Sequence, residues 1–191
     1  MSKGGSKKGR ITRSNYIDYD KAYNKALKLL NTKDAKFGLY IMTSINIGLR
    51  IGDILNLTHS DLINGEKEFR EEKTEKAKKV KFNKHILDAY NKVFKDVKVN
   101  ANDFIFKSQK NSVFTRQQIN RKLKNTFTIK NKNISSHSLR KTFGRRVYET
   151  NNESEKALLL LNDIYNHTSI KQTRDYLDIT QEEINNVYDC L

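Results

Sequence analysis

The chain holds 191 residues, enough for one domain with a hydrophobic core of its own. Its 37 Lys and Arg residues against 22 Asp and Glu residues leave a formal net charge of +15, which favours a polyanionic partner, most simply nucleic acid, over a merely basic soluble protein. The single cysteine, Cys190, excludes an intrachain disulfide, and the lack of an apolar run of ~18 residues excludes a membrane-spanning helix.

The first segment, residues 1–15, is rich in Gly, Ser and basic residues and has almost nothing to bury. This composition predicts a mobile cationic tail. Two interpretations are equally open on composition alone: an arm that contacts phosphates, or a solvated terminus without a partner.

Two helices are predicted next. Apolar residues at helical spacing predict a helix from Asp18 to Leu30. A second helix follows Thr32-Lys33-Asp34 and is apolar on nearly all sides, so we expect it at the centre of the core. Gly48 is expected to end it.

An arginine then stands in an apolar setting, in the segment Gly48-Leu49-Arg50-Ile51-Gly52-Asp53. We expect Arg50 to be buried and to need a partner, and Asp53 lies one helical turn away. The pair is either a structural ion pair or a guanidinium held ready for a phosphate, whose oxygens it matches in bidentate geometry.

The residue pattern from Leu62 to Phe82 predicts strands instead of helices. Leu62-Ile63, Glu66–Lys73 and Lys78–Phe82 are predicted as short antiparallel strands, with a tight turn at Asn64-Gly65. Thr74-Glu75-Lys76-Ala77 is predicted as the loop of a second hairpin, and lysines surround it. Most of these lysines suit a solvated sheet edge, and one of them could contact a phosphate or protonate a leaving oxygen.

Two helices separated by a short strand follow. Asn83–Phe94 is predicted as an amphipathic helix and Asp103–Phe106 as a strand, and His85 and His59 are expected to be exposed. Thr115 is expected to cap a helix that runs to Phe127. Its basic residues suit either a DNA groove or a plain helical surface. They are Arg116, Arg121, Lys122 and Lys124.

The segment Ser135-Ser136-His137-Ser138-Leu139-Arg140 is predicted to open a helix that runs to about Tyr148. His137 and Arg140 are three positions apart and therefore share one face. The free amides and positive potential of a helix N-terminus suit an anion there. A His-x-x-Arg pattern alone is weak, because a histidine at a helix start is usually structural.

A further helix is predicted from Glu153 to Tyr165, with Leu160 among its buried residues. His167 and Tyr176 follow, nine positions apart. On one unbroken helix nine positions advance about 900°, so the two side chains converge only if the chain turns between them. Thr168 or Ser169 can cap a new short helix there. A tyrosine so presented can act as a nucleophile if cations stabilise the group it attacks.

The last predicted helix spans Gln181–Leu191 and carries an apolar stripe of Ile184, Val187, Tyr188 and Leu191. Such a stripe is too hydrophobic to be left in water. It is expected to dock either on the chain's own core or on a neighbouring protomer.

Taken in order from Arg50 to Tyr176, these motifs resemble the catalytic domain of the tyrosine recombinases, the phage integrase family. The resemblance implies an α+β fold that is mainly α-helical, with a small three-stranded antiparallel sheet. It implies one catalytic domain over residues 16–191, after the tail of residues 1–15. The chain departs from the family in one respect: family integrases usually carry a separate N-terminal core-binding domain, and we expect none here because too few residues precede the second helix.

The resemblance also implies roles for the first group of residues. Arg50 and Arg140 resemble the two arginines that clamp the scissile phosphate. His137 resembles the histidine that assists proton transfer beside them, and Asp53 resembles the acid that supports the first arginine.

The remaining roles lie in the hairpin and near the nucleophile. His167 matches the histidine that bonds a non-bridging oxygen, and Tyr176 matches the nucleophile. Lys73 best matches the hairpin lysine that protonates the leaving 5′ oxygen, although Lys76 and Lys78 are close in register.

The implied activity is site-specific cutting and rejoining of DNA through a 3′-phosphotyrosine intermediate, with no metal and no cofactor. The implied partners are double-stranded DNA and further copies of the chain, as a tetramer on paired sites, in the cytoplasm near the nucleoid and with no membrane. Two alternatives are a type IB topoisomerase and a catalytically inactive DNA-binding regulator of the same fold.

Overall fold

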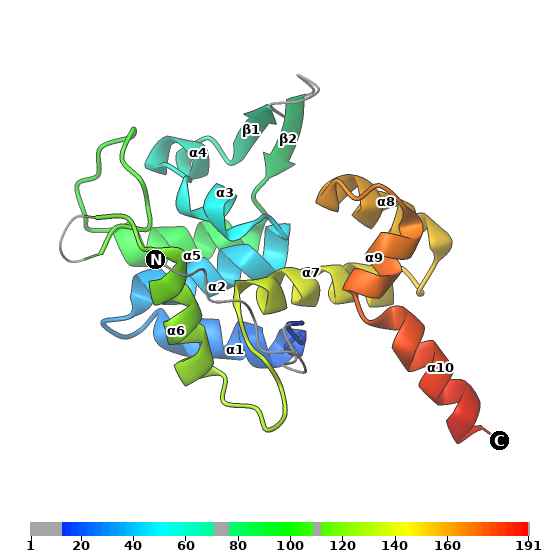
Figure 1. Cartoon of the computed structure of the whole chain (residues 1–191). Coiled ribbons are helices and arrows are strands. Elements are labelled where there is room, and N and C mark those ends of the chain that lie inside the picture. The colour runs from blue at the N-terminus through cyan, green and yellow to red at the C-terminus, as the bar shows by residue number, and fades with distance from the viewer. Residues whose placement is uncertain (1–12, 71–76, 109–111, 191) are drawn as a thin grey trace, which may run out of the picture.

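The computed structural model describes residues 13–70, 77–108 and 112–190 (Figure 1). The helices of these segments are α1 (Tyr19–Leu29), α2 (Ala35–Ile47), α3 (Ile51–Leu55), α4 (His59–Ile63), α5 (Lys84–Phe94), α6 (Arg116–Thr126), α7 (Ser136–Thr150), α8 (Glu155–Tyr165), α9 (Ile170–Tyr176) and α10 (Ile179–Asp189). One hairpin of β1 (Glu66–Arg70) and β2 (Ala77–Lys81) accompanies them. Within these segments, no helix combines the length and the apolar character needed to cross a membrane.

Helix α2 lies at the centre of the larger core, which confirms the prediction from its sequence. Most of its residues are buried, and α1, α5 and α7 pack against it. Gly48 ends the helix in the left-handed region, with φ of 61°. A Cβ atom at Gly48 would lie only 2.2 Å from the Phe143 ring, so glycine is needed both for the turn and for this close approach.

The sheet has two strands in the described segments, not the three that were expected. β1 and β2 pair in antiparallel register from Glu66 opposite Lys81 to Arg70 opposite Ala77. The expected first strand is the end of α4 instead. Thr58 and Asp61 form a capping box that starts this helix, and local capping of this kind favours a helical turn over a strand too short to pair.

His59 is buried, so its expected exposure is wrong. Its Nδ1 lies 2.9 Å from the Tyr90 hydroxyl, and its ring packs edge-on against Phe94 of α5. The capped start of α4 turns this side chain inward. The strand expected at Asp103–Phe106 is only an isolated bridge between Thr58 and Phe104.

A second, smaller core lies around α8 and α9, and α7 runs between the two cores (Figure 1). Ala157, Leu158 and Leu161 of α8 are buried there, but Leu160, which was expected to be buried, is 48% exposed. The buried face of α8 covers only one side of the helix, because no element of the described chain packs on the opposite side.

Helix α10 extends away from the body of the molecule (Figure 1). The stripe residues Ile184, Val187 and Tyr188 are 43%, 61% and 71% exposed, and Leu191 lies outside the described residues. The stripe therefore does not dock on the chain's own core.

Residues 1–12 of the expected tail lie outside the described residues. Residues 13–15, which the prediction counted with the tail, contact the body. Ser14 lies 2.6 Å from Ser135 between their hydroxyl oxygens, and the Asn15 amide donates to the Asn133 carbonyl.

Candidate active site

Arg140 is a buried cation at the start of α7. Ser135 caps this helix and forms a capping box with Ser138, so the first turn is well defined and presents Arg140 one turn in. The side chain is almost fully buried. Its Nη1 donates to the Gly48 carbonyl at 2.7 Å, and its Nη2 donates to the Tyr165 carbonyl at 3.3 Å. The guanidinium carbon also lies 4.3 Å from the centre of the Tyr165 ring.

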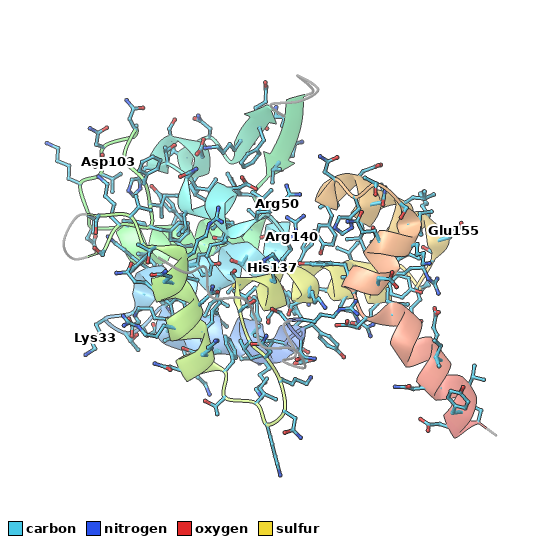
Figure 2. The ribbon with its side chains drawn as sticks, viewed as in Figure 1. Lys33, Arg50, Asp103, His137, Arg140 and Glu155 are labelled. Atoms are coloured by element: carbon cyan, nitrogen blue, oxygen red, sulfur yellow. The ribbon has the colours of Figure 1, made fainter. Side chains whose placement is uncertain are left out.

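Arg50 reaches the same place from another element. It is the N-cap residue of α3, and its Nη2 donates to the Tyr165 carbonyl at 3.3 Å. Figure 2 shows Arg50, Arg140 and His137 near one another, beside the first part of α7. The two guanidiniums therefore converge although the residues are far apart in the sequence.

The expected burial of Arg50 is wrong, because the residue is exposed. Of the two alternatives for Arg50 and Asp53, the structural ion pair is not formed among the described residues. The turn at Gly48 directs the Arg50 side chain toward the end of α8, whereas its apolar neighbours Ile54 and Leu55 point into the core.

The end of α8 supplies the shared carbonyl. The Tyr165 ring is buried, and its hydroxyl donates to the Arg140 carbonyl at 2.7 Å. A Cβ atom at Gly144 would lie 2.3 Å from that hydroxyl, so glycine lets α8 approach α7 this closely. Asn166 then ends α8 in the left-handed region, with φ of 53°, and leads the chain to His167.

The turn expected between His167 and Tyr176 is confirmed. Ser169 caps α9, accepting from the Gln172 amide at 3.2 Å, and Tyr176 is the last residue of that helix. The His167 and Tyr176 ring centres are 5.4 Å apart, and the Tyr165 ring lies 5.2 Å from the first and 5.3 Å from the second.

The Tyr176 hydroxyl is buried, and no group of the described chain meets hydrogen-bond geometry with it, although the Arg140 guanidinium lies close to it. Burial raises the pKa of this phenol to about 12, although the Arg140 guanidinium, through its charge and its closeness to the hydroxyl, and the Arg50 guanidinium act in the opposite direction. A buried polar atom without a partner is costly and uncommon in native structures, and it is typical of functional sites.

The histidines of the site are surrounded by positive charge. The pKa of His167 is lowered by burial and by Arg140 and Arg50. The pKa of His137 is lowered by burial and by four neighbouring cations: Arg140, Lys141, Arg50 and Arg116. Since the usual pKa of histidine is about 6.5, both rings are neutral at pH 7 in the DNA-free chain. Such a cluster of cations favours an anionic ligand.

Comparison with known proteins shows the family to which the chain belongs. A model of the phage integrase family matches residues 17–183, most of the chain. The chain belongs to this family. A curated relative, the probable integrase/recombinase YoeC of Bacillus subtilis (strain 168), is 31% identical over 163 residues, which cover 84% of this chain and 86% of that one.

Solved recombinases share the fold of this integrase-family chain. XerA recombinase matches with a TM-score of 0.67 and 20% identity, over 96% of this chain and 66% of its own. XerH bound to its difH substrate matches with a TM-score of 0.65 and 21% identity, over 92% and 53%. The present chain thus spans about two thirds of the first protein and half of the second. The expected α+β, mainly helical tyrosine-recombinase fold is confirmed.

Lys73, the expected lysine of the site, and the alternative Lys76 lie outside the described residues. Asp53 is half-buried, and its negative charge favours the protonated form of Arg140 by raising the pKa of that guanidinium. It does not pair with Arg50. The structure therefore brings together Arg50, His137, Arg140, His167 and Tyr176.

Lys141 is a site residue that sequence reasoning missed. It is almost fully buried, its Nζ lies 5.4 Å from the centre of the Tyr176 ring, and it pairs with Asp178 at 2.7 Å. Arg13 binds the same carboxylate at 2.9 Å. The only signal in the sequence was its position directly after Arg140.

Helix α6 presents a basic face beside the site. Arg116, Arg121 and Lys124 are exposed, and they lie within one side of the helix. Lys122 points away from them and pairs with Asp34 at 2.5 Å, with its ammonium 5.3 Å from the centre of the Phe37 ring. Of the four residues expected to contact DNA, Lys122 is thus held by the chain's own α2 region.

Proposed function

We propose that this integrase-family chain is a site-specific DNA recombinase that cuts and rejoins strands through a 3′-phosphotyrosine bond at Tyr176. The observation that carries the proposal is the convergence of two guanidiniums on the Tyr165 carbonyl, next to a buried tyrosine hydroxyl without a hydrogen-bond partner. Residues 16–191 form the catalytic domain in this proposal.

In the first step, the Tyr176 oxygen bonds to phosphorus as the bond from phosphorus to the 5′ oxygen breaks. Arg50 and Arg140 retain guanidinium N–H groups beyond those bound to carbonyls, and these bind the non-bridging oxygens as negative charge accumulates. This stabilisation offsets the high pKa of the Tyr176 phenol, because it acts on the transition state in which the phenolate attacks.

Protons move through two further groups. His137 is neutral at pH 7 and stands beside the clamp, so it takes the phenolic proton. Lys73 gives a proton to the departing 5′ oxygen. In the reverse reaction a 5′ hydroxyl from a partner strand attacks the phosphotyrosine and rejoins the DNA, with Tyr176 as the leaving group.

The chain binds duplex DNA, and the exposed basic face of α6 contacts it. The net charge of +15 supports this assignment, because phosphate contacts dominate the affinity of such proteins. XerH is solved bound to its difH substrate, and a lambda integrase dimer is solved bound to a core site. The latter shares the fold with a TM-score of 0.62.

Recombination needs more than one active site, so we assign a tetramer on paired sites in the bacterial cytoplasm. The exposed stripe of Ile184, Val187 and Tyr188 on α10 supports contact with a neighbouring protomer.

A suicide substrate tests the proposal. A duplex carrying repeats that flank the gene, nicked so that the released fragment diffuses away, should trap a covalent complex whose modified peptide contains Tyr176. Tyr176→Phe should abolish trapping and keep DNA binding, whereas Tyr23→Phe, at a tyrosine of α1 outside the site, should trap as the wild type does. If the wild type binds DNA but is not trapped, the chain is an inactive regulator. If the wild type relaxes supercoiled plasmids that lack any specific site, it is a topoisomerase.

A further inference from the structure

The second nitrogen of His167 is held by a chain of hydrogen bonds within the protein. His167 Nδ1 lies 3.0 Å from the Thr173 hydroxyl oxygen, and that hydroxyl lies 3.1 Å from Asn162 Oδ1. The Asn162 side chain also returns to the histidine backbone, because its Nδ2 donates to the His167 carbonyl at 3.1 Å. Thr173 is fully buried.

The His167 carbonyl, at the end of this series of hydrogen bonds, determines the direction of each bond in the series. The His167 carbonyl can only accept, so the amide nitrogen of Asn162 faces it and the amide oxygen faces Thr173. The Thr173 hydroxyl has one proton and gives it to that oxygen. The Thr173 oxygen must therefore accept from His167, which requires a proton on Nδ1.

We propose that Asn162 and Thr173 are positioning residues that hold His167 in the Nδ1–H tautomer, so that Nε2 can donate to the scissile phosphate only when the ring is an imidazolium. The donation from Nε2 to a DNA phosphate rests on the proposed function. The tautomer itself does not, because it follows from hydrogen bonds within the DNA-free chain.

The charged and titratable groups around His167 decide when this proton is taken up. Arg140 on α7 and Arg50 at α3 are cationic, and Tyr165 and Tyr176 contribute neutral rings. The two cations disfavour an imidazolium in the free protein. A DNA phosphate bound between them supplies the opposite charge, so DNA binding and protonation of His167 favour each other.

The sign of the resulting pH dependence is fixed. A donor that exists only in the protonated form is present below the pKa of His167 in the DNA complex and is lost as the pH rises through it. The contribution of His167 to cleavage should therefore fall with rising pH.

The first experiment measures the tautomer without DNA. Nitrogen-15 NMR of the four histidines of the chain distinguishes Nδ1–H from Nε2–H, and His167→Gln assigns the signal. His167 should be Nδ1–H in the wild type and in Thr173→Ser, and should move toward Nε2–H in Thr173→Val. Ser169→Ala removes the cap of α9 but not the hydrogen-bond chain, so it should keep the wild-type tautomer.

The second experiment measures single-turnover cleavage from pH 5.5 to 8.5 on the suicide substrate. Thr173→Val should cleave about 10- to 100-fold more slowly at low pH, because a hydrogen bond to the charged ring is lost. Its rate should fall less steeply with pH, since a neutral Nε2–H ring can still donate. Thr173→Ser should restore the wild-type profile.

The outcomes separate the inference from the function. An Nε2–H wild type, an unchanged tautomer in Thr173→Val, or an equal change in Ser169→Ala would overturn the inference whatever the DNA chemistry is. A wild type with the expected tautomer but no cleavage of any site would contradict the proposed function and leave the tautomer assignment intact.

Discussion

Arg50 and Arg140 donate to the same atom, the carbonyl oxygen of Tyr165, each at 3.3 Å. One residue is exposed and the other is buried, so the two cations share a role in the site but differ in their role in the fold. This difference separates their expected effects on catalysis and on stability.

Replacing either arginine should strongly slow cleavage, but only the replacement of Arg140 should weaken the fold. Arg50→Ala and Arg140→Ala should each slow single-turnover cleavage by about 10²–10³-fold, the usual cost of losing one preorganised charge contact. Arg140→Ala should also lower the free energy of unfolding by about 1–3 kcal/mol, because it leaves the buried Gly48 carbonyl without its donor. Urea denaturation measures the second effect, and Arg50→Ala should match the wild type there. Near-normal cleavage in either variant would contradict the phosphate clamp.

Tyr176→Phe should be no less stable than the wild type. The substitution removes a buried hydroxyl that has no partner in the described chain, and burial of an unsatisfied polar group costs about 1–3 kcal/mol. Tyr165→Phe is the matched comparison, because its hydroxyl donates to the Arg140 carbonyl and its loss should destabilise the protein. Thermal unfolding of both variants checks this. A less stable Tyr176→Phe would mean that the hydroxyl is satisfied in solution.

The basic face of α6 should contribute to DNA binding residue by residue. Arg121→Ala and Lys124→Ala should each weaken duplex binding and lower the slope of log affinity against log salt by about 1. Lys122→Ala is the control on the same helix, because its ammonium is paired with Asp34. Fluorescence anisotropy over a salt series measures the slopes. An equal loss of slope in Lys122→Ala would show that the docking face is placed wrongly.

The exposed stripe on α10 should act between protomers. Val187→Ser combined with Tyr188→Ser should leave the affinity for a single half-site unchanged and reduce cooperative assembly on paired half-sites, because both side chains are exposed in the isolated chain. Gel-shift titrations on one and two half-sites measure this, with Asn186→Ser as the control. Substitution is preferable to truncation after Asp178, because Ile179 belongs to the second core. Unchanged cooperativity would remove the stripe from the interface.

The buried His59 should make the DNA-free protein sensitive to acid. Burial lowers the pKa of His59 below its usual value. The unfolded chain therefore binds the proton more readily than the folded chain, and stability should fall as the pH drops below about 6.5 toward the lower folded pKa. The difference in unfolding free energy between pH 7.5 and 5.5 should shrink in His59→Gln. His85→Gln, at an exposed histidine, should keep the wild-type difference, and no change in His59→Gln would contradict the assignment.

The sequence by itself predicted most of the longer helices and the order of the functional residues. The caps predicted at Thr115 and at Thr168 or Ser169 are observed at Thr115 and Ser169, because an N-cap bond depends only on neighbours a few positions away. The turn between His167 and Tyr176 followed from helical geometry for the same reason.

Only the tertiary structure decided what each functional side chain contacts. Arg50 looked buried because its sequence neighbours are apolar, yet the left-handed turn at Gly48 sends it to a carbonyl at the end of α8. His59 looked exposed, yet α5 covers it. The bond from Asn162 through Thr173 to His167 depends on how α8 and α9 pack together. These contacts join residues on different elements, and no local pattern of residue types encodes the distance between two packed helices.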